Sequence, residues 1–427
     1  MNMVELIAKR RENQTHTFEE LEFIANGAAQ DSIPDYQLAA WLMAAFLNPL
    51  NLQETAWLTK AMAESGERID LSGLPHPWLD KHSTGGVGDK TTLVFLPIMA
   101  ACGLTVVKMS GRGLGITGGT VDKLGAIPGF RLDLSPEEMK AQANKIGLAI
   151  TGQTPRLAPA DGRLYALRDV TATVPSIPLI VSSILSKKVA GGADHVVFDV
   201  KCGAGAFMKT PADAQVLASQ LEQVGCELGL KVRARITDMD EPLGRCAGNA
   251  LEVKEAMAVL RGEERGRFRD LCFGLAASAL ELTGIPNAEQ KVMDVLDSGA
   301  ALEKTRQWME AQGGDPSVCD SDDWGHAPVT ETVEWSGEPG WVSDLDAEAV
   351  GLAVIDLGGG RKKKSDEINP AVGVECIAKV GDQVETGQTI FRIHAANQSD
   401  AEQAKQRLAT AITSQSNQPE PKPIFFN

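Results

Sequence analysis

Lysine, hydroxyl and glycine residues are concentrated in two short segments of this chain. The first segment, KHSTGGVGDKTT, runs from Lys81 to Thr92, and the second, KMSGRGLGITGGT, runs from Lys108 to Thr120. Glycine lets a backbone approach a ligand closely, while N–H groups, hydroxyls and an ammonium group are suitable ligands for a phosphate. Two such loops that meet at one edge of an α/β sheet would form an anion-binding site.

The spacing in the first segment differs from that of a nucleotide-binding P-loop. A G-x-x-x-x-G-K-[ST] motif that ends on Lys90 and Thr91 needs glycine at positions 84 and 89. The chain has Thr84 and Asp89 at those positions. We therefore expect a phosphate site of another kind and not an NTPase.

A third group of polar residues lies in helix-like sequence. Tyr165 and Arg168 belong to LYALRD, and Ser183 and Lys187 belong to SSILSKK. Residues four apart share one face of a helix, so Ser183 and Lys187 are expected to lie together. Their side chains could bind the carbonyl oxygens and ring nitrogen of a heterocyclic base. Taken alone, the pattern also fits a helix with solvated polar positions.

The elements that would position these residues alternate between strand-like and helix-like sequence. Such alternation indicates an α/β fold with a mixed, mostly parallel sheet. Thr17, followed by Glu19 and Glu20, is typical of a helix start. We expect strands at 194–200, 231–237 and 351–357, helices at 211–229 and 249–261, and a hairpin at 380–395.

These patterns divide the chain into three parts. Apolar, helix-like sequence in the two separate segments 1–65 and 160–190 predicts a discontinuous helical domain. Residues 75–155 and 191–330 are expected to form the α/β, phosphate-binding domain. The glycine-punctuated residues 331–427 are expected to form a C-terminal α+β module.

Composition excludes several classes of function. The 427 residues carry a formal net charge of -16, which opposes binding to nucleic acid and to anionic lipid. The polar start is not a signal peptide, and no apolar run is long enough to span a membrane. The seven cysteines form no C-x-x-C pair and are interpreted as reduced thiols, and no zinc site is recognisable. We expect a soluble cytoplasmic protein.

Five ordered motifs resemble those of the thymidine and pyrimidine-nucleoside phosphorylases. The resemblance extends along essentially the whole chain, through the C-terminal module. Chance agreement of five motifs in the same order is very improbable. The motifs are KHSTGGVGD at 81–89, SGRGLGITGGTVDKL at 110–124, LYALRDVTATV at 164–174, SIPLI at 176–180 and DVKCGAGAFM at 199–208.

The resemblance implies an enzyme that uses inorganic phosphate as co-substrate and needs no cofactor. It also implies a homodimer formed through the helical domains. Expected substrates are thymidine, deoxyuridine and uridine, and a strict thymidine phosphorylase is the alternative. Phosphate would be held by Lys81, Ser83, Thr92, Lys108, Ser110 and Thr120. The catalytic residues would be His82, Arg168 and Lys187, and the base would be held by His82, Arg168, Ser183 and Lys187, with Tyr165 and Ile180 lining its pocket.

The sequence departs from the family at three positions. Ile116 replaces the usual histidine of the signature loop, and Gly125 replaces the usual glutamate, which leaves the rigidity of the loop and the polarity of the cleft open. Some family members bind potassium at positions that correspond here to Leu243, Cys246 and Glu255, together with a threonine. Lys90 stands at the threonine position. We expect its ammonium group to pair with Glu255 in place of the ion, or else to point into solvent.

Two rival interpretations are weaker. A phosphoribosyltransferase similar to anthranilate phosphoribosyltransferase would share the helical domain and a phosphate loop, but it would need sites for pyrophosphate and usually magnesium. No obvious acidic pair for magnesium is present. A binding protein without activity would be favoured by the departures at Ile116 and Gly125, but the otherwise complete set of site residues opposes it.

Overall fold

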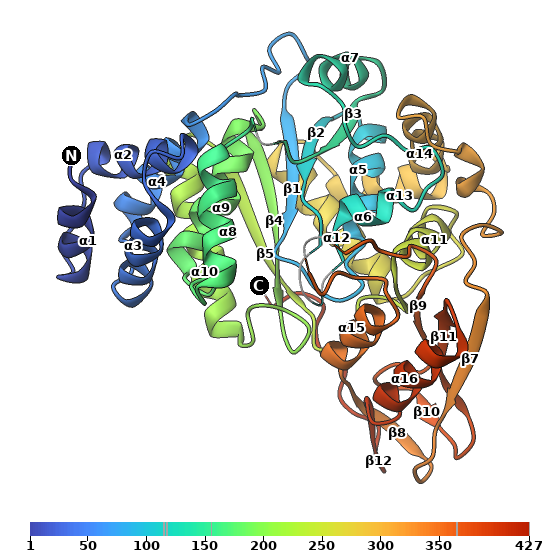
Figure 1. Cartoon of the computed structure of the whole chain (residues 1–427). Helices are drawn as coiled ribbons and strands as arrows, with labels where there is room; N and C mark the ends of the chain where they lie inside the picture. Colours follow the sequence, from blue (N-terminus) through green and yellow to red (C-terminus); the bar gives the residue numbers. More distant parts are fainter. Residues whose placement is uncertain (114–115, 117, 155, 364–365, 427) are drawn as a thin grey trace.

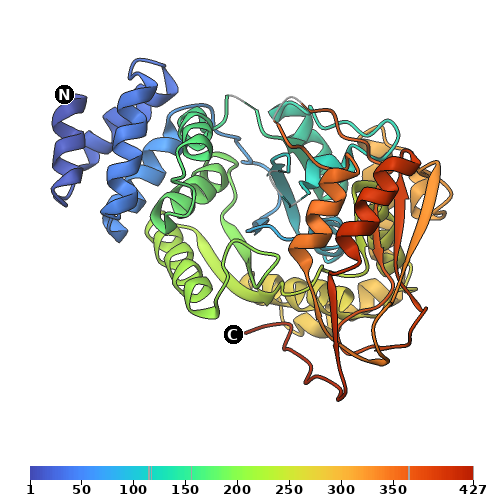
Figure 2. The same ribbon diagram turned by 60° about the horizontal axis from the view of Figure 1, so that its bottom comes forward.

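The structure, a computed structural model, describes residues 1–113, 116, 118–154, 156–363 and 366–426. Helices form the N-terminal end of the molecule, a parallel sheet lies in the middle, and a small C-terminal module lies at the other end (Figure 1). A second view shows the same arrangement (Figure 2).

The helical part begins with short helices that have clear capping signals. Thr17 caps α2 in a reciprocal capping box with Glu20, as the sequence predicted, and Asn51 caps α4 in the same way with Glu54. Arg10 and Glu54 form a buried ion pair at 2.9 Å that links α1 to α4. The bounds are α1 Met3–Arg11, α2 Phe18–Ala29, α3 Asp35–Leu47 and α4 Leu52–Glu64.

Two later helices pack against this bundle. Ala160 and Leu164 of α8 (Pro159–Val170) lie in one hydrophobic core with Leu21 and Trp41 of the first helices. α9 (Ile177–Ala190) packs against α4 on one side and against the sheet on the other. α8 and α9 thus contact helices that precede the first strand of the sheet.

The central sheet has the strand order β3-β2-β1-β4-β5, and every neighbouring pair is parallel. An antiparallel bridge joins Thr237 to Phe425 at the β5 edge. All residues of β4 are buried, which explains its continuous apolar sequence. The strands are β1 Trp78–Ser83, β2 Thr105–Ser110, β3 Leu148–Gly152, β4 His195–Cys202 and β5 Lys231–Asp238.

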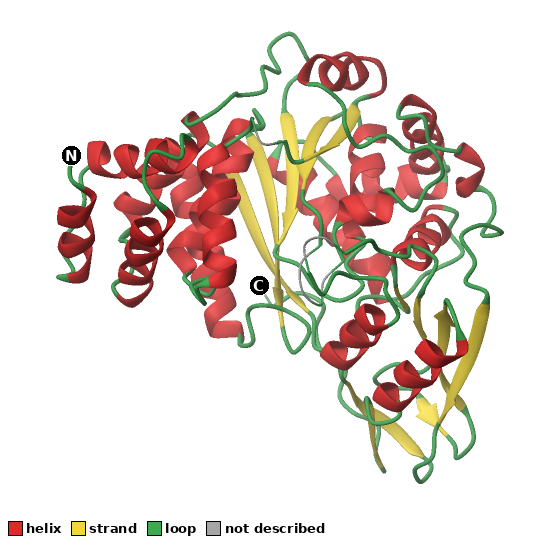
Figure 3. Ribbon diagram, in the orientation of Figure 1, coloured by secondary structure: helices red, strands yellow, loops and turns green. Residues whose placement is uncertain are grey.

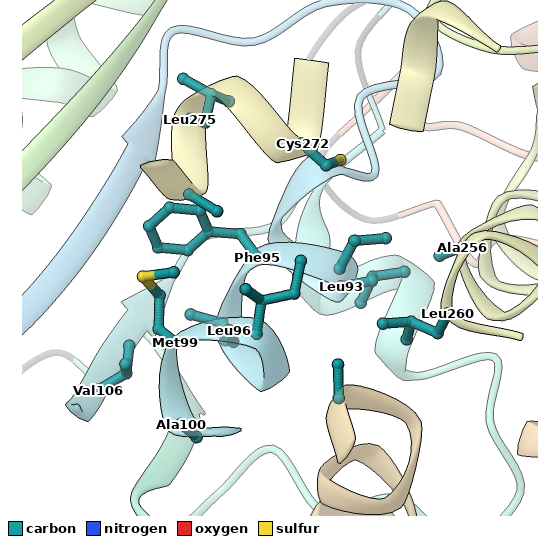
Figure 4. Close-up of a cluster of buried hydrophobic side chains, with 14 of the residues drawn as sticks. Leu93, Phe95, Leu96, Met99, Ala100, Val106, Ala256, Leu260, Cys272 and Leu275 are labelled. Carbon is teal, nitrogen blue, oxygen red and sulfur yellow. The ribbon is translucent and has the colours of Figure 1, made fainter. Parts of the chain in front are cut away.

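Helices cover both faces of the sheet (Figure 3). Val196 and Phe198 of β4 face the core under α9 and α10, whereas Val197 faces the core under α5 and α12. Leu93 and Phe95 of α5 lie at the centre of that second core (Figure 4). The helices are α5 Thr91–Ala101, α6 Thr120–Leu124, α7 Pro136–Ile146, α10 Pro211–Glu227, α11 Asn249–Leu260, α12 Arg267–Leu282, α13 Ala288–Asp297 and α14 Ala300–Ala311, and a 3-10 helix spans Pro316–Cys319.

The C-terminal module contains two small antiparallel sheets and two helices. Their strand orders are β10-β8-β12 and β6-β9-β11-β7, and β6 comes from the α/β domain. This pairing continues the second sheet across the domain boundary. The elements are β6 Cys246–Ala247, β7 Val329–Glu334, β8 Gly340–Leu345, α15 Ala347–Asp356, β9 Gly373–Cys376, β10 Gln383–Val384, β11 Thr389–Ala395, α16 Gln398–Leu408 and β12 Ile412–Gln415.

Two predictions in this module were wrong. The expected strand at 351–357 lies largely in α15, whose start is capped by Asp346. A short apolar run is compatible with either element, and here the cap selects the helix. The expected hairpin at 380–395 is also absent, because β10 pairs with β8 while β11 pairs with β7 and β9.

The seven cysteines are all unpaired, as the sequence predicted. Cys226 is exposed and Cys246 is half-buried, while the other five are buried. Within the described residues, every helix is too short or too polar to cross a lipid bilayer.

Candidate active site

The two glycine-rich loops follow neighbouring parallel strands. Lys81, His82 and Ser83 are the last residues of β1, and Lys108 and Ser110 lie at the end of β2. Because β1 and β2 are parallel, both loops leave the same edge of the sheet. The helix α5 begins directly after the first loop, so the positive end of its dipole also faces this edge. The predicted meeting of the two loops is therefore present.

Lys81 is fully buried in a network of opposite charges. Its ammonium group donates to the Thr91 hydroxyl and lies 3.5 Å from Asp199. Lys201 pairs with the same Asp199 carboxylate at 2.9 Å. Burial opposes ionisation of Asp89, but the charges of Lys81 and Lys201 hold the pKa of its carboxyl well below the ordinary value. The network therefore places carboxylate and hydroxyl oxygens around the buried Lys81 ammonium group.

Lys108 belongs to a second buried network. Its ammonium group lies 3.3 Å from Asp80 and donates to the backbone carbonyl of Lys81, while Lys188 contacts the other Asp80 oxygen at 2.7 Å. Burial, together with the charges of Lys188 and Lys81, lowers the pKa of Lys108 to about 7, although Asp80 acts in the opposite direction. A bound anion would favour the protonated form of Lys108.

His82 is a neutral imidazole in this environment. Burial lowers the pKa of His82 well below its ordinary value, and the charges of Lys188, Lys108, Lys187 and Lys81 lower it further. The ring packs edge-on against Phe198, with 6.0 Å between the ring centroids. A neutral imidazole can still donate one N–H hydrogen bond to a ligand oxygen.

Lys187 and Ser183 lie together on α9, as their spacing predicted. The Lys187 ammonium group lies 3.0 Å from the Ser183 hydroxyl and 2.5 Å from the carboxylate of Asp161 on α8. Asp161 is 2% exposed and its second oxygen has no hydrogen-bond partner among the described residues. The helix pair therefore holds an ammonium group and a hydroxyl side by side.

Arg168 is less available than the sequence suggested. Its guanidinium group donates to the carbonyls of Val174 at 2.6 Å and Thr173 at 3.4 Å in the connection between α8 and α9, and to that of Leu179 at 3.0 Å in the first turn of α9. Its carbon Cζ also lies 5.9 Å from the centre of the half-buried Tyr165 ring. Arg168 thus shapes the segment that leads into α9, and burial lowers the pKa of its guanidinium group.

The remaining predicted residues lie on the same elements. Thr92 is the second residue of α5 and is buried, while Thr120 begins α6. Ile180 lies on α9, on the side that packs against the sheet core. Ser83, Ser110, Thr120 and Ile180 are half-buried.

The signature loop contacts the C-terminal module. Ile116 packs against the core of that module, and a side chain at Gly351 of α15 would lie 3.0 Å from the Ile116 Cβ. The polar position of the family is thus an apolar contact here. Gly125 ends α6 with an ordinary helical backbone. Leu114, Gly115 and Thr117 of this loop lie outside the described residues.

Lys90 is buried and its ammonium group is surrounded by oxygen atoms. It lies 2.5 Å from the Leu243 carbonyl, 3.0 Å from the Cys246 carbonyl and 2.6 Å from Glu255. The ring of Phe268 lies 4.9 Å away on another side. Burial opposes the charge, but Glu255 outweighs it and raises the pKa of Lys90. These oxygens would suit a small cation, and the ammonium group already fills the space between them, so a metal ion does not fit.

Sequence reasoning assigned no role to several buried charges. Asp80, Asp161, Asp199 and Lys201 each hold one of the predicted lysines or its partner. A detectable signal was present, because Asp199 and Lys201 interrupt the apolar strand sequence HVVFDVKC. Charges in a buried strand are seldom tolerated without partners.

Comparisons with known proteins agree with this fold. Residues 4–66 match the helical bundle domain of a glycosyl transferase family, and residues 76–302 match the a/b domain of that family. Residues 341–415 match a pyrimidine nucleoside phosphorylase C-terminal domain. Anthranilate phosphoribosyltransferase from Thermus thermophilus shares the fold, with a TM-score of 0.57 and 20% identity over 72% of this chain and 99% of that one.

Two bacterial relatives are much more similar in sequence. The pyrimidine-nucleoside phosphorylase of Geobacillus stearothermophilus is 47% identical over 96% of this chain and 95% of its own length. That of Bacillus subtilis is 47% identical over 92% of both chains. The fold and the matched domains define a glycosyl transferase, and the chain is an enzyme of the pentosyltransferase class. It belongs to the thymidine and pyrimidine-nucleoside phosphorylase family.

Proposed function

We propose that the enzyme catalyses the reversible phosphorolysis of pyrimidine nucleosides. Thymidine, deoxyuridine and uridine would be split into the free base and α-D-(2-deoxy)ribose 1-phosphate. Membership of the family supports the pyrimidine-nucleoside phosphorylase activity. The single observation that carries the proposal is the placement of Lys81 and His82 at the end of β1 and of Lys108 at the end of the parallel strand β2.

Phosphate would bind at the carboxyl edge of β1 and β2. Lys81 and Lys108 supply positive charge, the start of α5 supplies backbone N–H groups, and hydroxyls complete the coordination. The predicted hydroxyl ligands Ser83, Ser110 and Thr120, together with Thr92, lie at the ends of the same elements. Inorganic phosphate is thus the co-substrate, and the proposed reaction uses no cofactor.

The nucleoside would bind on the α8–α9 side, with its anomeric carbon toward the phosphate. A phosphate oxygen then forms a bond to that carbon while the bond to the ring nitrogen breaks, and its electron pair moves into the base. Positive charge develops on the sugar and negative charge on the base carbonyl. The N–H of His82 and the ammonium group of Lys187 would stabilise that carbonyl oxygen. The released base anion takes its proton from solvent.

Closure of the two sides would increase the rate and protect the reaction. The proposed phosphate ligands lie at the ends of β1 and β2 and at the starts of α5 and α6, whereas Ser183 and Lys187 lie on α9, between the sheet and the helical bundle. Bringing them together aligns phosphate and nucleoside and excludes water, which would otherwise hydrolyse the nucleoside.

We also propose that Lys90 replaces the potassium ion of some family members. Its ammonium group contacts two carbonyl oxygens and Glu255, a set of ligands that a monovalent cation would otherwise use. The covalently attached charge would make potassium dispensable and tie the first glycine loop to the segment before α11.

A homodimer formed through the helical domain is the expected assembly. Large apolar side chains are exposed on α1 and α3, including Val4, Tyr36 and Leu47. These exposed apolar side chains are available for contact with a second copy of the chain. The absence of nucleic-acid binding and the cytoplasmic location stay predictions from composition.

The proposal is tested by incubating the enzyme with thymidine or uridine, with and without phosphate, and measuring free base. Phosphate-dependent release from both nucleosides is expected. Release from thymidine alone would support the strict thymidine phosphorylase. Binding of nucleoside without release from either would contradict the proposed reaction.

A further inference from the structure

Two successive residues of the short helix α6 attach the phosphate loops to different parts of the protein. Lys123 is fully buried, donates to the carbonyls of Asp89 and Gly118 at 2.8 Å each, and pairs with Glu252 at 3.0 Å. These contacts stay within the α/β domain. Asp122 instead reaches the C-terminal module, where it pairs with Arg361 at 2.9 Å.

The Asp122 carboxylate also fixes the backbone of the signature loop. One oxygen accepts the N–H of Gly113 at 2.6 Å, while the other faces Arg361. The Asp122 and Arg361 side chains are only 7% and 12% exposed. A single carboxylate therefore links Arg361 to the loop that joins Ser110 to Thr120.

A strand pairing and a hydrogen bond join the module to the α/β domain close to this pair. The strand β6 extends the β9 sheet, and Asn249 donates to the carbonyl of Gly359 at 3.0 Å, two residues before Arg361. A cavity of about 30 Å³, lined partly by Gly113, Asp122 and Arg361, separates the two parts at this point. The backbone that leads into Arg361 is thus tied to α11, independently of the contact between Arg361 and Asp122.

We propose that Arg361 is a positioning residue for the phosphate site. Through this residue the C-terminal module contributes to phosphate binding. The guanidinium group pairs with one oxygen of the Asp122 carboxylate and so directs the other oxygen at Gly113. Without it, the carboxylate would be left partly buried and unpaired and would turn toward water, releasing the Gly113 end of the loop. The inference rests on the proposed function because it assigns this loop to phosphate.

Steady-state kinetics of Arg361→Met and Arg361→Lys test the role in binding. Arg361→Met should raise KM for phosphate by about tenfold, because small displacements of a binding group are costly, with nucleoside KM and kcat at saturating phosphate nearly unchanged. Arg361→Lys should recover part of the loss. Asp122→Asn should have a similar effect, and the double variant should be no worse than the single ones.

Arg407→Met is the matched control, because Arg407 pairs with Asp356 at 2.7 Å inside the C-terminal module. Its KM for phosphate should equal that of the wild type. An equal rise of both substrate KM values in Arg361→Met, or the same rise in Arg407→Met, would mean general destabilisation and overturn the inference.

Hydrogen exchange of the segment 110–120 separates this inference from the proposed function. Exchange at this segment should be faster in Arg361→Met than in Arg407→Met, whether or not the enzyme consumes phosphate. If exchange is faster in Arg361→Met but the wild-type enzyme shows no phosphorolysis, the proposed function is refuted and the positioning role stands. Unchanged exchange with unchanged phosphate KM would refute the positioning role.

Discussion

Replacing Lys90 by methionine removes a buried charge and keeps most of the side-chain volume. Lys90 is 1% exposed, and its ammonium group contacts two carbonyl oxygens and Glu255. Removal of one partner from a buried ion pair costs about 3–5 kcal/mol. Glu255 would keep hydrogen bonds from the N–H groups of Arg245 at 2.6 Å and Cys246 at 2.9 Å. We therefore expect Lys90→Met to lower the free energy of unfolding by about 3 kcal/mol, the lower end of this range.

Thermal unfolding measures this loss directly. For a domain of this size, a loss of about 3 kcal/mol in the free energy of unfolding corresponds to a decrease in Tm of about 6 to 12 °C. Lys9→Met is the control, because Lys9 pairs with Glu20 at 2.7 Å on the surface, where an ion pair contributes at most about 1 kcal/mol. Equal decreases in the two variants would refute the role of Lys90 as an internal cation.

The same thermal unfolding measurement, made with and without potassium, tests whether Lys90 replaces the ion. The wild-type Tm should be the same in potassium and in a bulky organic cation at equal ionic strength. Lys90→Thr should be less stable in the organic cation and regain stability in potassium, because its oxygen ligands are then open to the ion. A wild-type Tm that rises with potassium would show that the ammonium group does not replace the ion.

Three further predictions concern the site. His82→Ala should mainly lower kcat, whereas Lys81→Ala should mainly raise KM for phosphate, and initial rates that match the wild type in either would remove the assigned role. Phosphate binding by the wild type should weaken as pH rises through about 7, because Lys108 loses its proton there. Phosphate binding by Lys108→Arg should weaken less over the same pH range. The ratio of the two KM profiles cancels the titration of phosphate itself, and a flat ratio would contradict this. Asp161→Asn should raise KM for the nucleoside about tenfold without changing that for phosphate, because Lys187 loses its partner.

The glycine loops and the parallel sheet were predictable because local chemistry determines them. Glycines and hydroxyls at the ends of apolar strands place polar ligands at one edge of a sheet, and the spacing of Ser183 and Lys187 fixes a shared helix face. The buried partners were not predictable in this way. Asp161 meets Lys187, and Asp80 meets Lys188, only through packing of distant segments.

Two other outcomes depended on tertiary contacts. The apolar residues 351–357 are compatible with strand or helix, and the cap at Asp346 decides between them. The state of His82 depends on charges from three different elements, so the sequence left open whether it is protonated, and the structure makes it neutral. The contact of Ile116 with the C-terminal module likewise needs the assembled fold.

The most direct test of the central claim is ³¹P NMR of the enzyme with inorganic phosphate and thymidine or uridine. The account predicts that the inorganic phosphate signal declines while a sugar 1-phosphate signal grows in equal amount with the free base, and that Lys81→Ala slows this at low phosphate. Release of base without any sugar phosphate, or no reaction with either nucleoside, would contradict it.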